Sequence, residues 1–278
     1  MKPATLRKKS VYKPLVPAVE QASRILLCLG EGDRFKMRLT DICKQVGIHK
    51  SKGHTILNTL IKFGLVEKDP HAKTYSLGPA LIFLSRYVLE NLNYTDIVSP
   101  FLEDLAKETN GAALFGLING EYVFVIAKRE GNQNIGFSTR LGHRFHITLG
   151  AHGKAIVAFM SEKDREKILA RKKLYFYGDI SRLNMKRLRD DLKKSGELGF
   201  AHDNGEITPG VNVISAPVFN IGEEVVGCVI LMGAFPKSMV EIFGSKVADV
   251  ARQVSYKLGA DLKTLAKNAK GNNLERAA

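Results

Sequence analysis

Residues 41–64, DICKQVGIHKSKGHTILNTLIKFG, restrict the possible folds of this chain more than any other segment. Apolar residues recur there at helical spacing in two short stretches, which Gly47 separates and Gly64 ends. This pattern predicts two short helices joined by a tight turn. The second helix, expected over 50–63, has Lys, Ser, His, Thr and Asn on its polar side and no acidic residue.

The flanking segments complete a recognisable order of elements. A helix is expected to begin at Pro17 and end before Gly30 and Gly32, and 35–39 is a strand candidate. Thr40 and Asp41 are typical of a helix N-cap and first turn. Residues 65–68 and 74–77 alternate like a hairpin around 69–73. The order helix, strand, helix, turn, helix, hairpin predicts a winged helix-turn-helix.

The polar face of the second helix indicates nucleic-acid binding. At 100° per residue, Ile56, Leu57 and Leu60 fall on the same side as Gly53. Lys and Asn can bind guanine and adenine edges, Ser and Thr can bind either, and a helix N-terminus favours phosphate. A solvated helical hairpin in an unrelated bundle is the alternative. The candidate DNA-contacting residues are Lys50, Ser51, Lys52, His54, Thr55 and Asn58 on the helix, with His71 and Lys73 at the tip of the wing.

Charge is distributed unevenly along the 278 residues, which carry a net charge of +14. Residues 1–78 hold 15 Lys and Arg against 6 Asp and Glu, whereas residues 79–278 hold 27 against 22. Such an excess favours a polyanionic partner for the first part, although a merely basic soluble surface is the alternative.

Composition argues for a cytoplasmic protein. An apolar fraction of 45% and a charged fraction of 25% are ordinary for globular chains, and the length suggests about two domains. The N-terminus has no apolar stretch of a secretory signal, and no run approaches the ~18 apolar residues of a membrane span. The 3 cysteines are scattered, which fits a reducing compartment. We therefore expect no membrane association.

The remainder of the chain predicts an α+β domain. Strand patterns come in blocks that are separate from the helical patterns, which favours a largely antiparallel sheet. Helices are expected at 80–91, 95–109, 152–173, 184–195 and 237–262, and strands at 112–118, 121–129, 134–140, 145–149, 211–219 and 224–232.

These patterns predict the domain organisation. Residues 1–13 are expected to form a disordered basic arm and 14–78 the winged helix-turn-helix domain. A mostly apolar linker helix follows in 79–93, then an effector domain in 94–262 and a flexible tail in 263–278.

Three segments resemble one family. LTDICKQVGIHKSKGHTILNTLIKFGLVEKD with YSLGPALIFLS, then LGAHGKAIVAFMS, and finally GFAHDNGEITPGVNVISAPVFN are similar to segments of the IclR family of bacterial transcriptional regulators. The resemblance spans roughly residues 15–260. It implies a winged helix that binds a double-stranded DNA operator, a linker helix that helps dimerisation, and a GAF-like domain that binds a small metabolite. A homodimer or tetramer that represses or activates a catabolic operon is the corresponding expectation.

The sequence departs from the family pattern at three places. Gly53 stands where an apolar, often β-branched residue usually packs, and a glycine there costs helix stability of about 1 kcal/mol relative to Ala. Gly205-Glu206 replaces two adjacent acids, and VILMGA replaces an ending with small residues and serine.

The resemblance also implies the effector site. Members that bind small oxo-acids use hydroxyl or thiol side chains on the strands, whereas the matching positions here are apolar. An apolar lining favours a hydrophobic or aromatic effector, whose single acid group could be bound by backbone N–H groups at 150–152. Alternatively, the apolar residues are ordinary core and the effector is a small oxo-acid such as glyoxylate or pyruvate. The implied residues are Gly150, Ala151, His152, Asp203, Val211, Val213, Ile230 and Met232.

No metal, cofactor or catalytic site is expected. His143, His146 and His152 are close in sequence, but none forms a helical i, i+4 pair and no cysteine is near. The chain has no GxSxG and no phosphate-binding glycine loop, and Ser215 has no evident base. An enzyme with a DNA-binding appendage is a remote alternative. A DNA-binding protein whose second domain only oligomerises is another.

Overall fold

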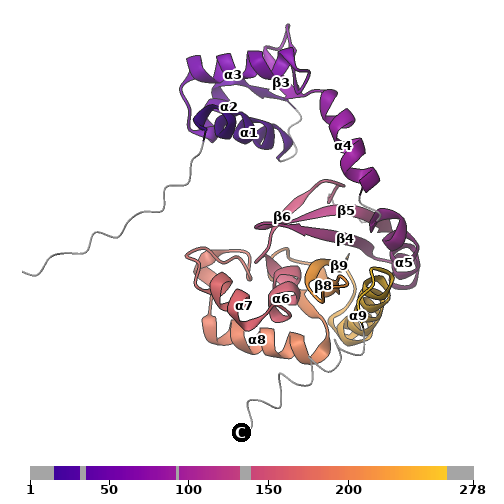
Figure 1. The fold of residues 1–278 in the computed structure, drawn as a ribbon. Helices are drawn as coiled ribbons and strands as arrows, with labels where there is room; N and C mark the ends of the chain where they lie inside the picture. Colours follow the sequence, from indigo (N-terminus) through magenta and orange to yellow (C-terminus); the bar gives the residue numbers. More distant parts are fainter. Residues whose placement is uncertain (1–15, 32–35, 92–93, 132–138, 262–278) are drawn as a thin grey trace, which may run out of the picture. The chain divides into compact units, whose positions relative to one another are not determined.

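The computed structural model describes residues 16–31, 36–91, 94–131 and 139–261. The chain divides into two compact units, residues 1–92 and 93–278. Figure 1 shows the elements of each unit.

The first unit is a winged helix-turn-helix, as predicted. Its three strands form one antiparallel sheet in the order β1-β3-β2, and β2 and β3 form the wing hairpin. The elements are α1 (Pro17–Gly30), β1 (Met37–Arg38), α2 (Leu39–Val46), α3 (Lys50–Lys62), β2 (Val66–Asp69), β3 (Thr74–Leu77) and α4 (Ala80–Asn91).

One apolar core holds this unit together. Ile25 of α1, Ile42 of α2 and Leu57 of α3 are fully buried in it, and Tyr75 of β3 closes it. Gly47 ends α2 with a φ of 75°, a left-handed conformation that glycine adopts without strain. The turn therefore has the geometry that the sequence predicts.

Gly53 lies at the point where α3 packs on α2. A Cβ atom there would stand 2.4 Å from Cys43 Sγ, and Ile48 and Leu39 would also contact it. The missing side chain thus lets the two helices approach closely around the cysteine sulfur. Close helix packing therefore requires a glycine at this position, although glycine lowers helix propensity.

Two local predictions in this unit are wrong. The helix α2 begins at Leu39 with Arg38 as its N-cap, so Thr40 lies inside the helix and donates a hydrogen bond to Asp41 at 3.4 Å. The strand before it has two residues instead of five, because Leu39 already packs with the helices. Phe35 lies outside the described residues.

The second unit is an α+β domain with an antiparallel sheet, again as predicted. The strand order is β6-β5-β4-β9-β8-β7, and each of these neighbouring pairs is antiparallel. The elements are α5 (Tyr94–Thr109), β4 (Ala112–Asn119), β5 (Tyr122–Glu130), β6 (Arg144–His146), α6 (Gly150–Ala158), α7 (Glu162–Leu169), a 3-10 turn (Ile180–Arg182), α8 (Met185–Leu198), β7 (Ala201–Asn204), β8 (Asn212–Phe219), β9 (Val225–Gly233), a second 3-10 turn (Lys237–Met239) and α9 (Val240–Lys257).

Helices cover both faces of this sheet (Figure 1). On one face α5 and α9 pack together over Phe115, Ile214 and Val229. On the other face α6 lies against β7, β8 and β9, and α7 and α8 pack behind it. The start of α6 therefore lies inside the domain.

Some boundaries differ from the predicted ones. The predicted helix over 152–173 is two helices, because Ser161 caps α7 by accepting a hydrogen bond from the Asp164 backbone at 3.2 Å. The short strand β7 was not predicted, since AHDN has little apolar pattern. Residues 147–149 form a turn rather than a strand. Of the strand predicted over 134–140, residues 134–138 lie outside the described residues, and 139–140 are not in a strand.

Among the described residues, no helix combines the length and the apolar character that crossing a membrane requires.

Candidate DNA interface and effector site

The polar face of α3 is open to solvent. All six of its candidate DNA-contacting residues are exposed, while Gly53, Leu57 and Leu60 on the opposite side are buried. The helix therefore separates its packing side from its polar side, as a helix that enters a major groove must do.

Local hydrogen bonds organise this face. His49 caps the helix, and its Nδ1 accepts from the Ser51 backbone at 3.4 Å. Thr55 Oγ1 donates to the Ser51 carbonyl at 3.0 Å, and Asn58 Nδ2 lies 3.3 Å from His54 Nδ1. A donor–acceptor pair of His54 and Asn58 one helical turn apart can present a fixed pattern to base edges.

The wing tip is ordered by Asp69. Its Oδ1 accepts from the backbone N–H groups of His71 and Ala72, each at 3.0 Å, and Lys36 binds its Oδ2 at 3.1 Å. The Ala72 bond and the Lys36 ammonium hold the pKa of Asp69 below its usual range. His71 and Lys73 are exposed on this tip, and Lys73 has a φ of 52°.

The wing and α3 share one groove. Lys68, which the sequence analysis did not single out, lies along it with its Nζ 5.6 Å from the centre of the Tyr75 ring. The pairing of β2 with β3 places this lysine opposite Tyr75, in the same groove as His54 of α3. The groove is lined by Leu39, His54, Lys68, Pro70, Lys73 and Tyr75.

The three apolar effector candidates lie on one face of the sheet. Val213 of β8 is opposite Met232 of β9, and Ile230 is two residues back on the same face. Ile230 is 1% exposed and belongs to the core, whereas Val213 and Met232 are partly exposed. Thr139 Oγ1 lies 3.9 Å from Met232 Sδ. Two of the three side chains are therefore accessible to a ligand.

The start of α6 meets Asp203 beside these strands. Gly150, Ala151 and His152 are buried, and Leu149 at the N-cap position provides no side-chain bond. The first N–H groups of a helix have no intrahelical acceptor. Asp203 is 4% exposed, accepts from the Glu206 backbone at 2.7 Å, and has its Oδ2 3.8 Å from the Cβ position of Gly150.

Val211 is half-buried at the end of the loop that follows Asp203. Its backbone N–H donates to Thr208 at 3.0 Å and closes that loop just before β8. It thus lies two residues from Val213.

The histidines form an aromatic cluster next to this site. His152 Nε2 lies 3.4 Å from the His146 carbonyl, and its ring centre is 4.9 Å from that of Phe145. Burial lowers the pKa of His152 to about 4, so it is neutral at physiological pH. His146 Nδ1 lies 2.8 Å from Thr148 Oγ1. Within the described ranges, no group of three or more His, Cys, Asp and Glu side chains could hold a metal ion.

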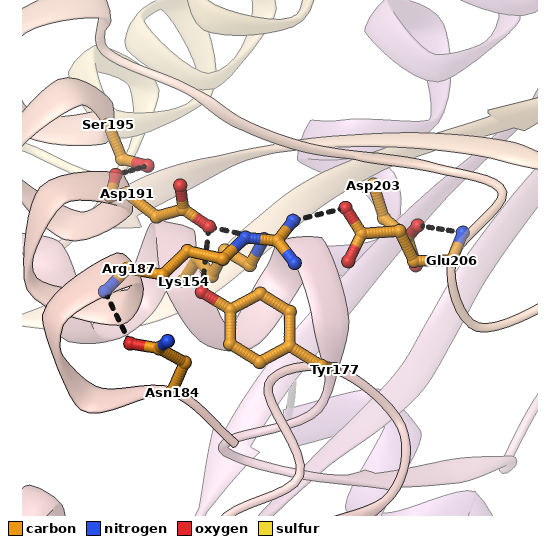
Figure 2. A network of polar contacts seen from close by, with 8 residues as sticks. All are labelled: Lys154, Tyr177, Asn184, Arg187, Asp191, Ser195, Asp203 and Glu206. Atoms are coloured by element: carbon orange, nitrogen blue, oxygen red, sulfur yellow. Dashed lines mark hydrogen bonds and ion pairs between the residues drawn. The ribbon is translucent and has the colours of Figure 1, made fainter. Parts of the chain in front are cut away.

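Sequence reasoning missed a polar network behind the site (Figure 2). Lys154 of α6 has a side chain that is 5% exposed, and its Nζ pairs with Asp191 Oδ2 at 2.9 Å. Tyr177 donates to the same oxygen at 3.0 Å, and its ring centre lies 4.7 Å from the lysine Nζ. Burial opposes ionisation of Asp191, but Lys154 outweighs it and lowers the pKa of the carboxyl. A lysine within the apolar segment AHGKAIVAFM is the sequence signal.

This network continues to the loop after β7. Arg187 stacks 4.4 Å over the Tyr177 ring and forms an ion pair with Glu206. Arg182 donates to the Glu206 carbonyl at 2.8 Å. The Glu206 backbone N–H in turn binds Asp203 of β7, so Glu206 links the loop after β7 both to the site residue Asp203 and to Arg187 of α8 (Figure 2).

Comparison with known proteins agrees with this arrangement. The family description "IclR helix-turn-helix domain" matches residues 18–70, and "Bacterial transcriptional regulator IclR C-terminal" matches residues 86–256. The chain is 26% identical over 218 residues to the HTH-type transcriptional regulator XynR of Escherichia coli, with coverage of 78% of this chain and 86% of that protein.

Solved structures share the fold. An IclR regulator from Alicyclobacillus acidocaldarius is 24% identical with a TM-score of 0.75, over 87% of this chain and 99% of that one. An IclR homologue from Microbacterium hydrocarbonoxydans, complexed with 4-hydroxybenzoate, is 17% identical with a TM-score of 0.71, over 87% and 98%.

A winged helix joined to a separate α+β domain, matched in both parts by regulator families, defines a DNA-binding transcriptional regulator with an effector domain rather than an enzyme. The chain belongs to the IclR family of bacterial transcriptional regulators.

Proposed function

We propose that the eight candidate residues on α3 and the wing contact operator DNA, together with Lys68. The observation that supports this most is the acid-free, fully exposed face of α3 beside the groove that it shares with the wing. Lysines at the helix start and along the wing would bind phosphates, and Thr55 and Asn58 would bind base edges.

The test is a gel-shift titration against a duplex selected by the full chain from a random library. Lys50→Ala and Lys52→Ala are expected to weaken binding to all sequences and to flatten its salt dependence. Thr55→Ala and Asn58→Ala are expected to relax preference at particular base pairs by ~1–3 kcal/mol. Lys163→Ala, an exposed lysine on α7, is the control. Four variants that bind like the unaltered chain would contradict this assignment.

We further propose that the effector is a hydrophobic or aromatic compound with a single acid group, from a catabolic pathway whose operon this regulator controls. Val213 and Met232 would contact its apolar body, and the uncapped start of α6 would bind its carboxylate. The buried carboxyl group of Asp203 beside this helix start makes it costly to bury the second carboxylate of a doubly charged acid there.

A small oxo-acid such as glyoxylate or pyruvate is the second candidate. The N–H groups at 150–152, at the start of a helix whose N-cap residue provides no side-chain bond, favour it, since a small acid needs little more than such donors. The near-complete burial of Ile230 also supports this alternative, because one of the three apolar residues then acts as core.

A thermal-shift screen separates the two effector classes. Aromatic monoacids, including 4-hydroxybenzoate, are compared with glyoxylate and pyruvate. Met232→Ser is expected to reduce the affinity for aromatic acids and to leave DNA binding without ligand unchanged. Stabilisation by the small acids alone would refute the apolar pocket.

We also propose that α4 pairs with its copy in a second subunit. Its residues Ile82, Phe83 and Leu84 are 73%, 62% and 51% exposed, which is unfavourable for three large apolar side chains on a free helix. Two subunits would match two operator half-sites. Light scattering that gives a monomer mass at micromolar concentration would rule out this assembly.

A further inference from the structure

Ile207 lies against two glycines, Gly150 of the proposed effector site and Gly178. A Cβ atom on Gly150 would stand 2.7 Å from Ile207 Cδ1, and one on Gly178 would stand 3.4 Å from Ile207 Cγ1. Both glycines have a left-handed backbone, with φ of 52° and 84°. Other residues would be strained in this conformation and would also crowd Ile207 at Gly150. The two glycines thus form a close-fitting seat for one isoleucine side chain.

The Ile207 side chain packs next to the first residue of α6. Gly150 is the first residue of that helix, and the Cβ position that Ile207 approaches is also 3.8 Å from Asp203 Oδ2. Ile207 therefore covers Gly150 on the side where the proposed effector carboxylate and Asp203 would meet. An effector that reaches the first N–H groups of α6 must pack against Ile207 or displace it.

The loop around Ile207 is fastened to neighbouring elements on the side before this residue. Before it, Glu206 is held by Asp203 through its backbone N–H, by Arg182 through its carbonyl and by Arg187 through its carboxylate. After it, Thr208, Pro209 and Gly210 are exposed. Gly205 and Gly210 both have positive φ, of 77° and 81°, and glycine can change such angles at low cost. Ile207 therefore lies between Glu206, which other segments hold in place, and the exposed residue Thr208.

We propose that Ile207 determines the size of the effector, as an apolar side chain that limits the space between Gly150, Gly178 and the bound molecule. This inference rests on the proposed effector site. Replacing Ile by Ala removes three carbon atoms, so the variant should accept an aromatic monoacid that carries a branched three-carbon substituent. An unsubstituted acid should lose a packing contact instead.

The experiment is calorimetric titration of the full chain with benzoate and with 4-isopropylbenzoate. For Ile207→Ala, the ratio of the affinity for 4-isopropylbenzoate to that for benzoate is expected to rise at least tenfold over the ratio of the unaltered chain. Ile207→Val should give a smaller rise and hardly perturbs the fold. The control is Ile221→Ala, an 80% exposed isoleucine in the β8–β9 turn, which should leave the ratio unchanged.

Two other results of the titration would distinguish failure of the size inference from failure of the aromatic-effector proposal. If both acids bind and the ratio is the same in the Ile207 variants and in the unaltered chain, Ile207 does not set the size, although the aromatic-effector proposal stands. If neither acid binds any of these proteins, the aromatic-effector proposal fails and the size inference fails with it.

Discussion

Helices α3 and α6 differ in whether the residues proposed for binding also belong to the packed core. The six candidate residues of α3 are exposed, and Ser51, His54, Thr55 and Asn58 form hydrogen bonds within one helical turn, whereas all nine residues of α6 are buried. A substitution on α3 can therefore change binding alone. A substitution around α6 changes the packing of the domain at the same time, so affinity and stability must be measured together there.

The largest expected effect tests whether the apolar strand residues are core or lining. Ile230→Ala should lower the free energy of unfolding by about 2–5 kcal/mol, because a 1% exposed side chain leaves a cavity when it is truncated. Met232→Ala should cost clearly less, since this side chain is already partly exposed. Scanning calorimetry of the full chain measures both. Equal losses would make Met232 a core residue and would remove it from the effector site.

The next effect concerns the ion pair behind α6. Asp191→Ala should destabilise the second unit by about 3 kcal/mol, because it leaves the 5% exposed Lys154 ammonium unpaired. Lys154→Met should cost less, since the Asp191 side chain is 30% exposed and can regain water. The pKa of Asp191 is lowered in the fold, so its contribution is present at neutral pH and is lost as pH falls through that pKa. Equal costs for the two variants would contradict the asymmetry.

A third prediction uses the pKa of His152. This pKa falls from about 6.5 to about 4 on folding, so protonation favours the unfolded chain. The contribution is constant above pH 6.5 and decreases as the pH drops toward 4. Between pH 7.5 and 5 it should cost about 2 kcal/mol. His152→Asn should show a correspondingly flatter decline in denaturant titrations, and an identical decline would mean that His152 is already solvated.

The smallest effect on stability is expected on α3. Thr55→Ala and Asn58→Ala should each change the free energy of unfolding by less than about 0.5 kcal/mol, although both are expected to alter DNA binding. The same calorimetry checks this. A loss above 1 kcal/mol in either variant would show that the recognition face also supports the fold, and the contrast with α6 would disappear.

The sequence was most informative where side chains interact with neighbours along the chain. Helical periodicity and Gly47 predicted α2, the turn and α3, and alternation with turn residues predicted the wing and the central strands. The same helical periodicity predicts both the buried face of α3 around Leu57 and its exposed polar face, because it assigns each residue to one side of the helix.

Contacts between residues far apart in the chain could not be predicted from periodicity or turn residues. The pairing of Lys154 with Asp191 joins two helices 37 residues apart, and the seat of Ile207 depends on glycines at 150 and 178. Periodicity contains no information about which loop folds over which helix. The assignment of Ile230 shows the same limit, since a strand residue looks alike in sequence whether it is core or ligand lining.

The contact between Gly53 and Cys43 has a consequence for protein engineering. A Cβ atom at position 53 would lie 2.4 Å from Cys43 Sγ. A recognition helix taken from another regulator, with an apolar residue at this position, would therefore not fit beside the sulfur. A transplant that also replaces Cys43 by alanine would restore the room. Residues 43 and 53 therefore have to be exchanged together when α3 of this protein is replaced.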